Sequence, residues 1–203
     1  MTHFISIGHR KQTGKDTFAR ALVATLEDAG KIVVHTHYAG FLKTLVSNLF
    51  DIPMEHLTGD GDQRDAVVKN RKVWDMLTAR HPEALRHLDN PPTARQVVQV
   101  FGTTMREHFP GIWLEHVLGR DYGADYVVLS DMRFAEEAEA VRRRGGHLIQ
   151  IRRTGFMGGD SHRSERELDS WDDWDYVVHN TSIDSLKASA SVYAGALLSR
   201  NHD

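Results

Sequence analysis

The stretch HFISIGHRKQTGKDTFARALVATL, residues 3–26, decides the fold. Its first six residues are an apolar run that predicts a short buried β-strand. Phe18, Leu22 and Leu26 recur at helical spacing and predict an amphipathic helix. A second apolar run at 31–38 predicts another strand, so the first 38 residues form a strand–helix–strand unit. Such a unit has a right-handed crossover and a parallel sheet.

The turn between this first strand and helix has the features of a phosphate-binding loop. Backbone N–H groups at a helix N-terminus point toward a bound anion, and the helix dipole favours negative charge there. Gly14 lets the main chain approach a phosphate closely, and Lys15 can reach its outer oxygens. We therefore expect the phosphates of a nucleotide to contact Gly8, Arg10, Lys11, Gln12, Thr13, Gly14, Lys15, Asp16 and Thr17.

The loop departs from the usual pattern at two points. Five residues separate Gly8 from Gly14, whereas the usual pattern has four between its glycines. Asp16 follows Lys15 where Ser or Thr is usual. A carboxylate can hold Mg²⁺ or its water shell as a hydroxyl does, so Asp16 and Thr17 are the candidate Mg²⁺ ligands. The alternative is an ordinary strand-to-helix turn in which Asp16 only favours the start of the helix.

The remaining pattern predicts an α/β fold with about five parallel strands covered on both faces. Further strands are expected at 125–130, 147–153 and 176–180, and helices at 39–50, 93–108, 112–119, 134–144 and 183–199. Residues 51–92 are the least legible part, and we expect a loop followed by helix there.

Three further segments at strand ends carry usable chemistry, since ligands bind open parallel sheets at the carboxyl ends of strands. Asp131 could hold a metal-bound water, and Arg133 could grip an acceptor phosphate; the alternative for Asp131 is a cap on the next helix. Arg152 and Arg153 lead into a Gly-rich segment that resembles a lid. Within that segment, Ser161 and Glu165 belong to a further polar cluster. The alternatives are a solvated strand end for the arginines and a helix cap for the serine.

A second group of polar residues follows the second predicted strand. Tyr38 opens the helix that carries Lys43, which is either an acceptor-phosphate contact or a surface lysine. Arg95, Gln99 and Arg106 are spaced by four and seven residues, so they share a helix face and could reach a polar substrate.

The histidines give weaker evidence for a metal. His35 and His37 alternate and therefore share one face of a strand. A pair of histidines without a neighbouring carboxylate in the sequence is a weak sign of a structural metal site.

Composition excludes several classes of protein. The chain has 203 residues, 40% of them hydrophobic, and no Cys, which excludes disulfides and thiolate metal sites and fits a reducing cytosol. The formal net charge of −3 argues against stable binding along a nucleic-acid backbone. No apolar run is long enough for a membrane span or forms a signal core, so we expect a cytoplasmic protein that does not bind membranes.

Several blocks of the sequence resemble the phage-type deoxynucleoside monophosphate kinases, members of the P-loop nucleoside/nucleotide kinase superfamily. They are GKDTFARAL (14–22), YAGFLK (38–43), TARQVVQVFGTTMREHFPGIWLEHVL (93–118), SDMRFAEEAEAVRRRGGHLIQIRR (130–153) and SHRSERELDSWDDWDYVVHN (161–180). Their order and spacing are more specific than any one block. The sequence departs from the family pattern at His9, where a first glycine would align, and at Gly40, where a polar residue is more usual.

The resemblance implies a single P-loop NTPase domain over 1–203, a three-layer α/β/α fold with a five-stranded parallel sheet and the loop strand central. It implies a helical acceptor-binding region at 39–120 and a lid at about 152–175. The implied substrates are ATP with Mg²⁺ and a deoxynucleoside 5′-monophosphate. In this assignment Lys15, Asp131, Arg133 and Arg153 are catalytic, Arg152 contacts ATP, and the acceptor contacts Tyr38, Lys43, Arg95, Gln99, Arg106, Asp131, Arg133, Ser161 and Glu165.

Rival functions use the same loop. A small-metabolite kinase of the phosphomevalonate kinase type would need a different acceptor pocket. A kinase acting on a hydroxymethylated base in DNA would need a wide basic track, and a binding module would leave the paired arginines unexplained. The accepted base, the sugar preference and the oligomeric state, a homodimer included, are not fixed by the sequence. A phage origin, and with it a host cytoplasm, follows only from the resemblance.

Overall fold

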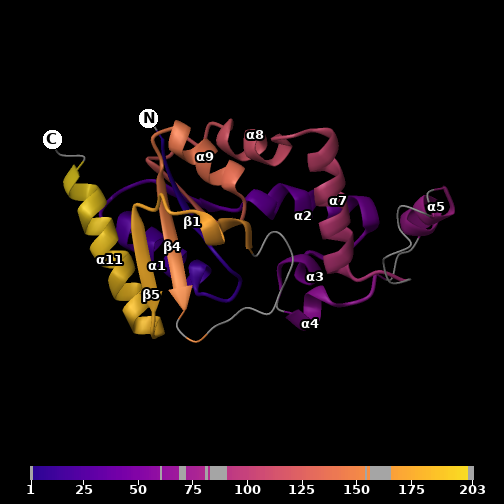
Figure 1. Ribbon diagram of the computed structural model, residues 1–203, viewed down its shortest axis with the longest axis horizontal. Helices are drawn as coiled ribbons and strands as arrows, with labels where there is room; N and C mark the ends of the chain where they lie inside the picture. The colour runs from indigo at the N-terminus through magenta and orange to yellow at the C-terminus, as the bar shows by residue number, and fades with distance from the viewer. Residues whose placement is uncertain are drawn as a thin grey trace. The chain divides into compact units, whose positions relative to one another are not determined.

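The computed structural model describes residues 2–59, 61–68, 72–80, 82, 91–153, 155 and 166–200. The chain divides into two compact units (Figure 1). The first joins Met1–Tyr38 to Val117–Asp203, and the second is Ala39–His116. No helix among the described residues combines the length and the apolar character needed to cross a membrane.

The first unit is built on a five-stranded sheet in the order β2-β3-β1-β4-β5, and every neighbouring pair is parallel. The strands are β1 (His3–Gly8), β2 (Val33–Thr36), β3 (Tyr126–Met132), β4 (His147–Arg153) and β5 (Tyr176–Asn180). The sheet is that of the predicted α/β class, and the strand that leads into the loop is central.

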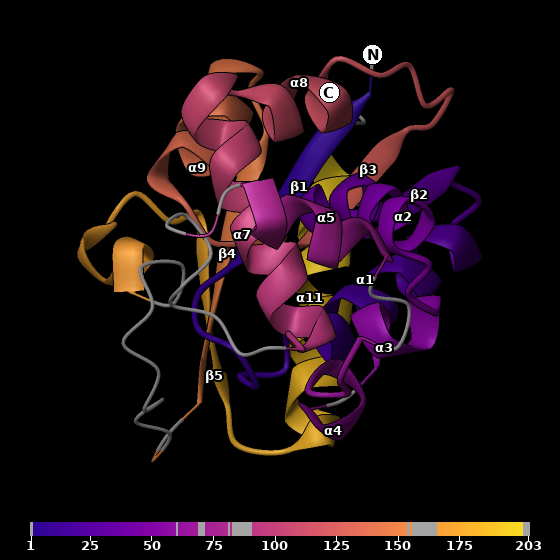
Figure 2. The same ribbon diagram turned by 90° about the vertical axis from the view of Figure 1, so that its right-hand side faces the viewer.

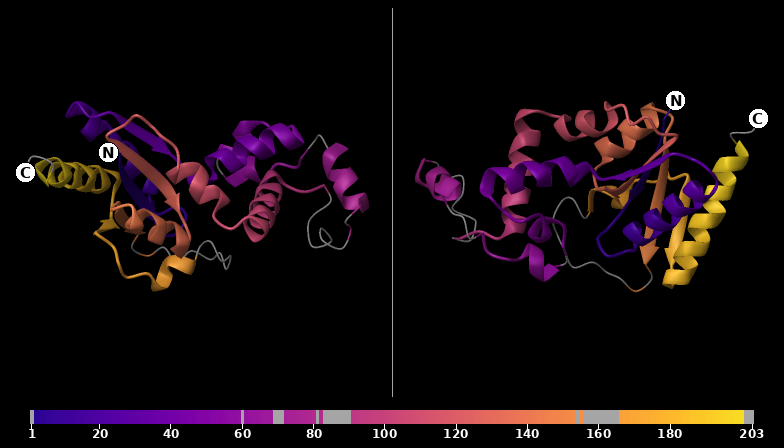
Figure 3. Two further views of the ribbon diagram at one scale, coloured as in Figure 1. Left: turned by 90° about the horizontal axis from the view of Figure 1, so that it is seen from above. Right: turned by 180° about the vertical axis from the view of Figure 1, so that it is seen from behind.

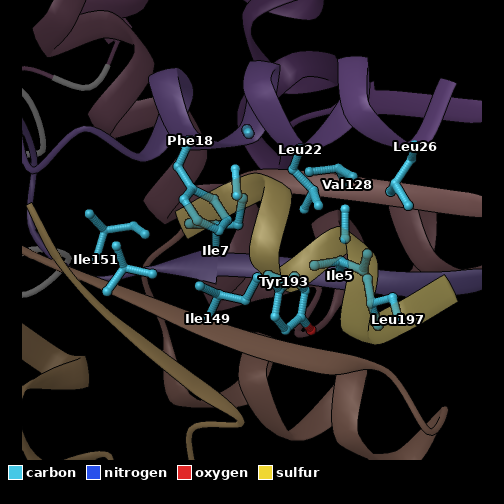
Figure 4. Packing of buried hydrophobic residues seen from close by; sticks show 14 of the residues in the cluster. Ile5, Ile7, Phe18, Leu22, Leu26, Val128, Ile149, Ile151, Tyr193 and Leu197 are labelled. Atoms are coloured by element: carbon cyan, nitrogen blue, oxygen red, sulfur yellow. The ribbon is translucent and has the colours of Figure 1, made fainter. Parts of the chain in front are cut away.

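Side chains alternate between the two faces of this sheet. Ile5 and Ile7 of β1 point to one face and join a core cluster with Val128 and Ile149 from the neighbouring strands (Figure 4). Phe18, from the first helix, also belongs to this cluster and is fully buried. Nearly continuous apolar residues on the central strands are expected when both faces of a parallel sheet are covered.

Helices cover the sheet as the layered fold requires. α1 (Lys15–Asp28) and α11 (Ile183–Arg200) pack side by side over the face that carries Ile5 and Ile7 (Figure 3). α9 (Ala135–Arg143) packs against β1 and β4. A short 3₁₀ helix, η1 (Glu167–Ser170), precedes β5.

The second unit is helical. Its elements are α2 (Tyr38–Phe50), α3 (Met54–Thr58), α4 (Gly61–Arg64), α5 (Lys72–Arg80), α7 (Ala94–His108) and α8 (Ile112–Leu118), with α2 and α8 linking it to the first unit. α3 packs against both α4 and α7 (Figure 2). The unit has its own core, in which Val46, Phe50, Trp74 and Trp113 are buried.

The structure adjusts several predicted boundaries. β3 extends to Met132, two residues beyond the predicted strand, so Asp131 lies within a strand. β2 is shorter than its predicted range. Short helices α3 and α4 lie where a loop was expected, and α5 is a helix in the later part of 51–92, where one was expected. The predicted acceptor-binding region, 39–120, overlaps the second unit, but its function stays a prediction, as does that of the lid.

Candidate functional site

The candidate phosphate-binding loop leaves the carboxyl end of β1, the central strand, and enters α1 at Lys15. Gly14 precedes the helix with φ 101°, a left-handed conformation that favours glycine. An α-helix leaves its first N–H groups without partners inside the helix, and Gly14 has no side chain to cap them. The start of α1 therefore has the donor geometry that an anion needs.

His9 accounts for the unusual spacing of the loop. Four residues lie between it and Gly14, and its φ of 97° is the left-handed conformation of a glycine. This conformation fits the expected alignment of His9 with the first glycine, and it costs about 1–2 kcal/mol for a residue with a Cβ. Burial lowers the pKa of its imidazole, and its Nδ1 has no hydrogen-bond partner among the described residues.

Lys15 lies within the loop. Its side chain is buried, with 6% exposed, and its Nζ donates hydrogen bonds to the carbonyl oxygens of His9, at 3.0 Å, and Arg10. The ammonium group is therefore held inside the turn that the backbone makes. The role of Lys15 at the phosphates of a nucleotide stays a prediction.

The edge strand β5 contacts the part of the loop that leads into α1. Asn180, the last residue of β5, donates a hydrogen bond from Nδ2 to the carbonyl oxygen of Thr13 at 2.8 Å. A Cβ on Gly14 would lie 2.6 Å from Leu186 Cδ1 and 2.8 Å from Asn180 Nδ2. Position 14 therefore needs glycine for its conformation and for the close approach of these side chains.

An ion pair attaches the loop to η1. The guanidinium of Arg10 contacts both carboxylate oxygens of Asp169, at 3.1 and 2.7 Å. The pKa of the Asp169 carboxyl is lowered, chiefly by hydrogen bonds from Arg10. Two-point pairing of this kind restricts the guanidinium more than a single contact would.

Two arginines from the ends of β3 and β4, the strands on either side of β1, contact the same loop. Arg133, just beyond β3, donates from Nη1 to the carbonyl oxygen of His9 at 3.3 Å. Arg153, at the end of β4, donates from Nη1 to the carbonyl oxygen of Gln12 at 3.4 Å. Arg152 donates from Nε to Gln150 at 2.6 Å instead. The predicted cations Arg133 and Arg153 are thus brought to the loop.

Asp16 and Thr17 occupy the first turn of α1. Asp16 Oδ1 accepts a hydrogen bond from Ser130 Oγ at 2.7 Å. Hydrogen bonding from His37 and then from Ser130 holds the pKa of Asp16 well below its usual range. The carboxylate is therefore charged at neutral pH, and with the Thr17 hydroxyl it supplies the oxygen donors that Mg²⁺ prefers.

Asp131 and Tyr38 are linked to each other. The N–H of Tyr38, the first residue of α2, donates to Asp131 Oδ1 at 2.8 Å, so Asp131 caps α2 and not the helix that follows it. The Tyr38 ring is 3% exposed, and its hydroxyl lies 3.4 Å from Ser6 Oγ. Burial raises the pKa of this phenol well above its ordinary value.

The remaining predicted acceptor residues belong to the second unit. Lys43 is on α2, and α7 carries Arg95, Gln99 and Arg106 as expected. Arg95 forms an ion pair with Asp65 at 2.7 Å. Ser161 and Glu165 lie outside the described residues.

Sequence reasoning missed Ser130, Asn180 and Asp169 as contacts of the loop. Ser130 and Asn180 are the last residues of the predicted strands 125–130 and 176–180, and that position was the available signal. Asp169 lies in an acidic, Trp-containing stretch without periodicity, and nothing in the sequence pairs it with Arg10.

Two comparisons relate the chain to known sequences. The family model described as deoxynucleotide monophosphate kinase matches residues 42–189. A protein of Acanthamoeba polyphaga mimivirus, provisionally named a deoxynucleotide monophosphate kinase, is 29% identical over 184 residues, covering 87% of this chain and 88% of that protein. The family match begins after the phosphate-binding loop, so the geometry of the loop is an independent observation.

A comparison with solved structures finds weaker likeness. Cobyrinic acid a,c-diamide synthase from Mycobacterium smegmatis with bound ADP and magnesium is 14% identical, with a TM-score of 0.37. The alignment covers 97% of this chain and 82% of that structure.

Proposed function

Since the chain belongs to the deoxynucleotide monophosphate kinase family, we propose that it transfers the γ-phosphoryl group of ATP to a deoxynucleoside 5′-monophosphate at the loop 8–17. The reaction class is a phosphotransfer whose acceptor is itself a phosphate group. One observation carries the assignment of the site: the loop lies at the end of the central strand, with Lys15 inside it and Arg133 and Arg153 bonded to its carbonyls.

Phosphoryl transfer between two anionic nucleotides requires that their charges be neutralised and that the reacting groups be aligned. A phosphate monoester has a second pKa near 6, so the acceptor is mostly a dianion at neutral pH. It is a nucleophile already and needs no general base. The protein has to offset repulsion between two polyanions and hold them in line. A set of cations around one loop, in a chain of net charge −3, meets that need.

Each cation has a distinct proposed part. Lys15 contacts the β- and γ-phosphates of ATP, and the first N–H groups of α1 bind the same oxygens. Arg133 contacts the acceptor phosphate, because its guanidinium can bind two oxygens at once. Arg153 stabilises charge on the transferring group, and Arg152, with the other loop residues, contacts ATP.

Asp16, with Thr17, holds Mg²⁺, either directly or through water. When bound there, Mg²⁺ neutralises charge on the β- and γ-phosphate oxygens. Asp16 suits this role because its carboxylate remains charged at neutral pH and lies in the first turn of α1.

The acceptor side is proposed from the resemblance of the sequence to the family. Lys43, Arg95, Gln99 and Arg106 offer side chains for a sugar, base or phosphate, and Gln99 is exposed. Asp131 and Tyr38 position the start of α2, the helix that carries Lys43. Ser161 and Glu165 are proposed contacts of the lid.

A chromatographic assay tests this function. Purified protein, ATP and Mg²⁺ are incubated with each common deoxynucleoside monophosphate, each matching ribonucleotide, and phosphomevalonate. We expect a deoxynucleoside diphosphate from at least one of the first set. If phosphomevalonate alone is phosphorylated, the proposed acceptor is wrong. If no acceptor gives a product, the proposed reaction is refuted.

A further inference from the structure

Two histidines and a carboxylate meet beside the first turn of α1. Asp16, His35 and His37 each offer a ligand atom, and these atoms all lie within 4.8 Å of one another. Oδ1 of Asp16 is 3.7 Å from Nε2 of His37, and the two imidazole rings have centroids 5.0 Å apart. Asp16 comes from α1 and His35 from β2, and His37 lies between the end of β2 and the start of α2.

The three atoms converge on a single point. Ser130 Oγ lies 2.7 Å from Asp16 Oδ1, 2.9 Å from His35 Nε2 and 3.0 Å from His37 Nε2. A hydroxyl donates one hydrogen bond and accepts two, so both histidines donate from Nε2 in this arrangement. The hydroxyl thus occupies a position that three metal-ligating atoms surround.

The spacing is close to that of a metal centre. Bonds of about 2.0–2.2 Å from Zn²⁺ to nitrogen and oxygen place two tetrahedral ligands about 3.4 Å apart. The distance from Asp16 to His37 is already 3.7 Å, and these side chains are 64% and 41% exposed. The remaining pairs of ligand atoms lie within 4.8 Å, so the side chains have to draw closer when an ion binds.

We propose that Asp16, His35 and His37 form a binding site for a first-row transition metal ion, with Zn²⁺ as the preferred ion. Two imidazole nitrogens and one carboxylate oxygen suit such ions, whereas Mg²⁺ prefers oxygen alone. Three protein ligands leave one position of a tetrahedral site open for water or another oxygen.

The consequence for catalysis rests on the proposed function, although metal binding itself does not. Asp16 is the residue proposed to hold Mg²⁺, so the two ions compete for one carboxylate. The histidines add ligands only for the transition metal, and millimolar Mg²⁺ therefore leaves most of the bound Zn²⁺ in place.

Metal binding without nucleotide tests the site. Full-length protein free of any affinity tag is titrated with Co²⁺, whose visible absorption reports nitrogen ligands and four-coordination, and then with Zn²⁺ in competition. We expect one ion per chain. His37→Gln and His35→Gln should each weaken binding by at least about 100-fold, since loss of a ligand costs more than loss of an outer-shell partner.

Two further variants separate a ligand set from a hydrogen-bonded cluster. Exposed His179 is the matched control, and His179→Gln should leave the affinity unchanged. Ser130→Ala removes the central hydroxyl and should retain Zn²⁺ within about threefold, because Oγ is not a ligand in this assignment. Thermal melting without metal checks that each variant is folded.

Three results would overturn the site: no stoichiometric metal binding, equal affinity in the wild type and both histidine variants, or a loss in Ser130→Ala as large as theirs. Metal binding by a protein that transfers no phosphate would refute the proposed function alone. Phosphate transfer by a protein that binds no Co²⁺ or Zn²⁺ would refute this site alone.

Discussion

Asn180 donates a hydrogen bond to the carbonyl oxygen of Thr13, 2.8 Å away, across 167 residues of sequence. The contact ties an edge strand of the sheet to the loop that leaves its centre. Leu186, one turn into α11, approaches the same loop, since a Cβ on Gly14 would lie 2.6 Å from its Cδ1. The shape of the loop therefore depends on the last strand and helix of the chain as well as on its own sequence.

Gly14→Ala should destabilise the protein and weaken ATP binding together. The backbone cost of φ 101° is about 1–2 kcal/mol, and the clash with Leu186 and Asn180 adds about 1–3 kcal/mol. Gly30→Ala is the matched control, because Gly30 has φ 79° but open space around its Cβ position. Urea denaturation of both variants measures the difference; equal losses would contradict the steric argument.

The ion pair of Arg10 and Asp169 should contribute stability that disappears in acid. The folded pKa of Asp169 is lowered, so its contribution is present above the unfolded pKa of about 3.9 and is lost as the pH falls below it. A double-mutant cycle of Arg10→Gln and Asp169→Asn should give a coupling free energy of about 0.5–1 kcal/mol at pH 7. The coupling should approach zero once the pH falls below the lowered folded pKa of Asp169. A coupling free energy that does not change with pH would show that charge is not its source.

Arg133→Gln should lower kcat/KM by about 100-fold, since removal of one charged donor at a transferring group costs about 2.7–4 kcal/mol at most. The KM for the acceptor should rise more than the KM for ATP, because Arg133 is assigned to the acceptor phosphate. Arg143, two-thirds exposed on α9, supplies the control Arg143→Gln. A change in ATP affinity alone would reverse the assignment of Arg133.

The strand, turn and helix that carry the candidate phosphate-binding loop were predictable because their signal is local. Gly14, Lys15 and the flanking apolar runs are contiguous, and their order alone fixes a strand, a turn and a helix. The left-handed φ of His9 was not predictable, since a histidine rarely adopts it and only the surrounding contacts hold it there. The resemblance aligns His9 with the first glycine of the family pattern, and its φ of 97° is compatible with that alignment.

The contacts that complete the site come from tertiary packing. His35 and His37 were evident as a pair, but their carboxylate partner is Asp16, which reaches them because α1 packs against β2. Asp131 was expected at a strand end, yet its role in capping α2 depends on the pairing of β2 with β3. The short helices α3 and α4 escaped prediction because isolated segments of this length carry little intrinsic helical signal.

The most direct test of the account follows a labelled phosphate. Protein is incubated with ATP labelled in the γ-phosphate, Mg²⁺ and each deoxynucleoside monophosphate, and the position of the label is read in the separated products. We expect label in the β-phosphate of a deoxynucleoside diphosphate. The rate should be at least about 100-fold lower for Lys15→Met and unchanged for Lys187→Met, at an exposed lysine of α11. Two results would contradict phosphoryl transfer at this loop: no labelled deoxynucleoside diphosphate with any acceptor, or a wild-type rate of transfer by Lys15→Met.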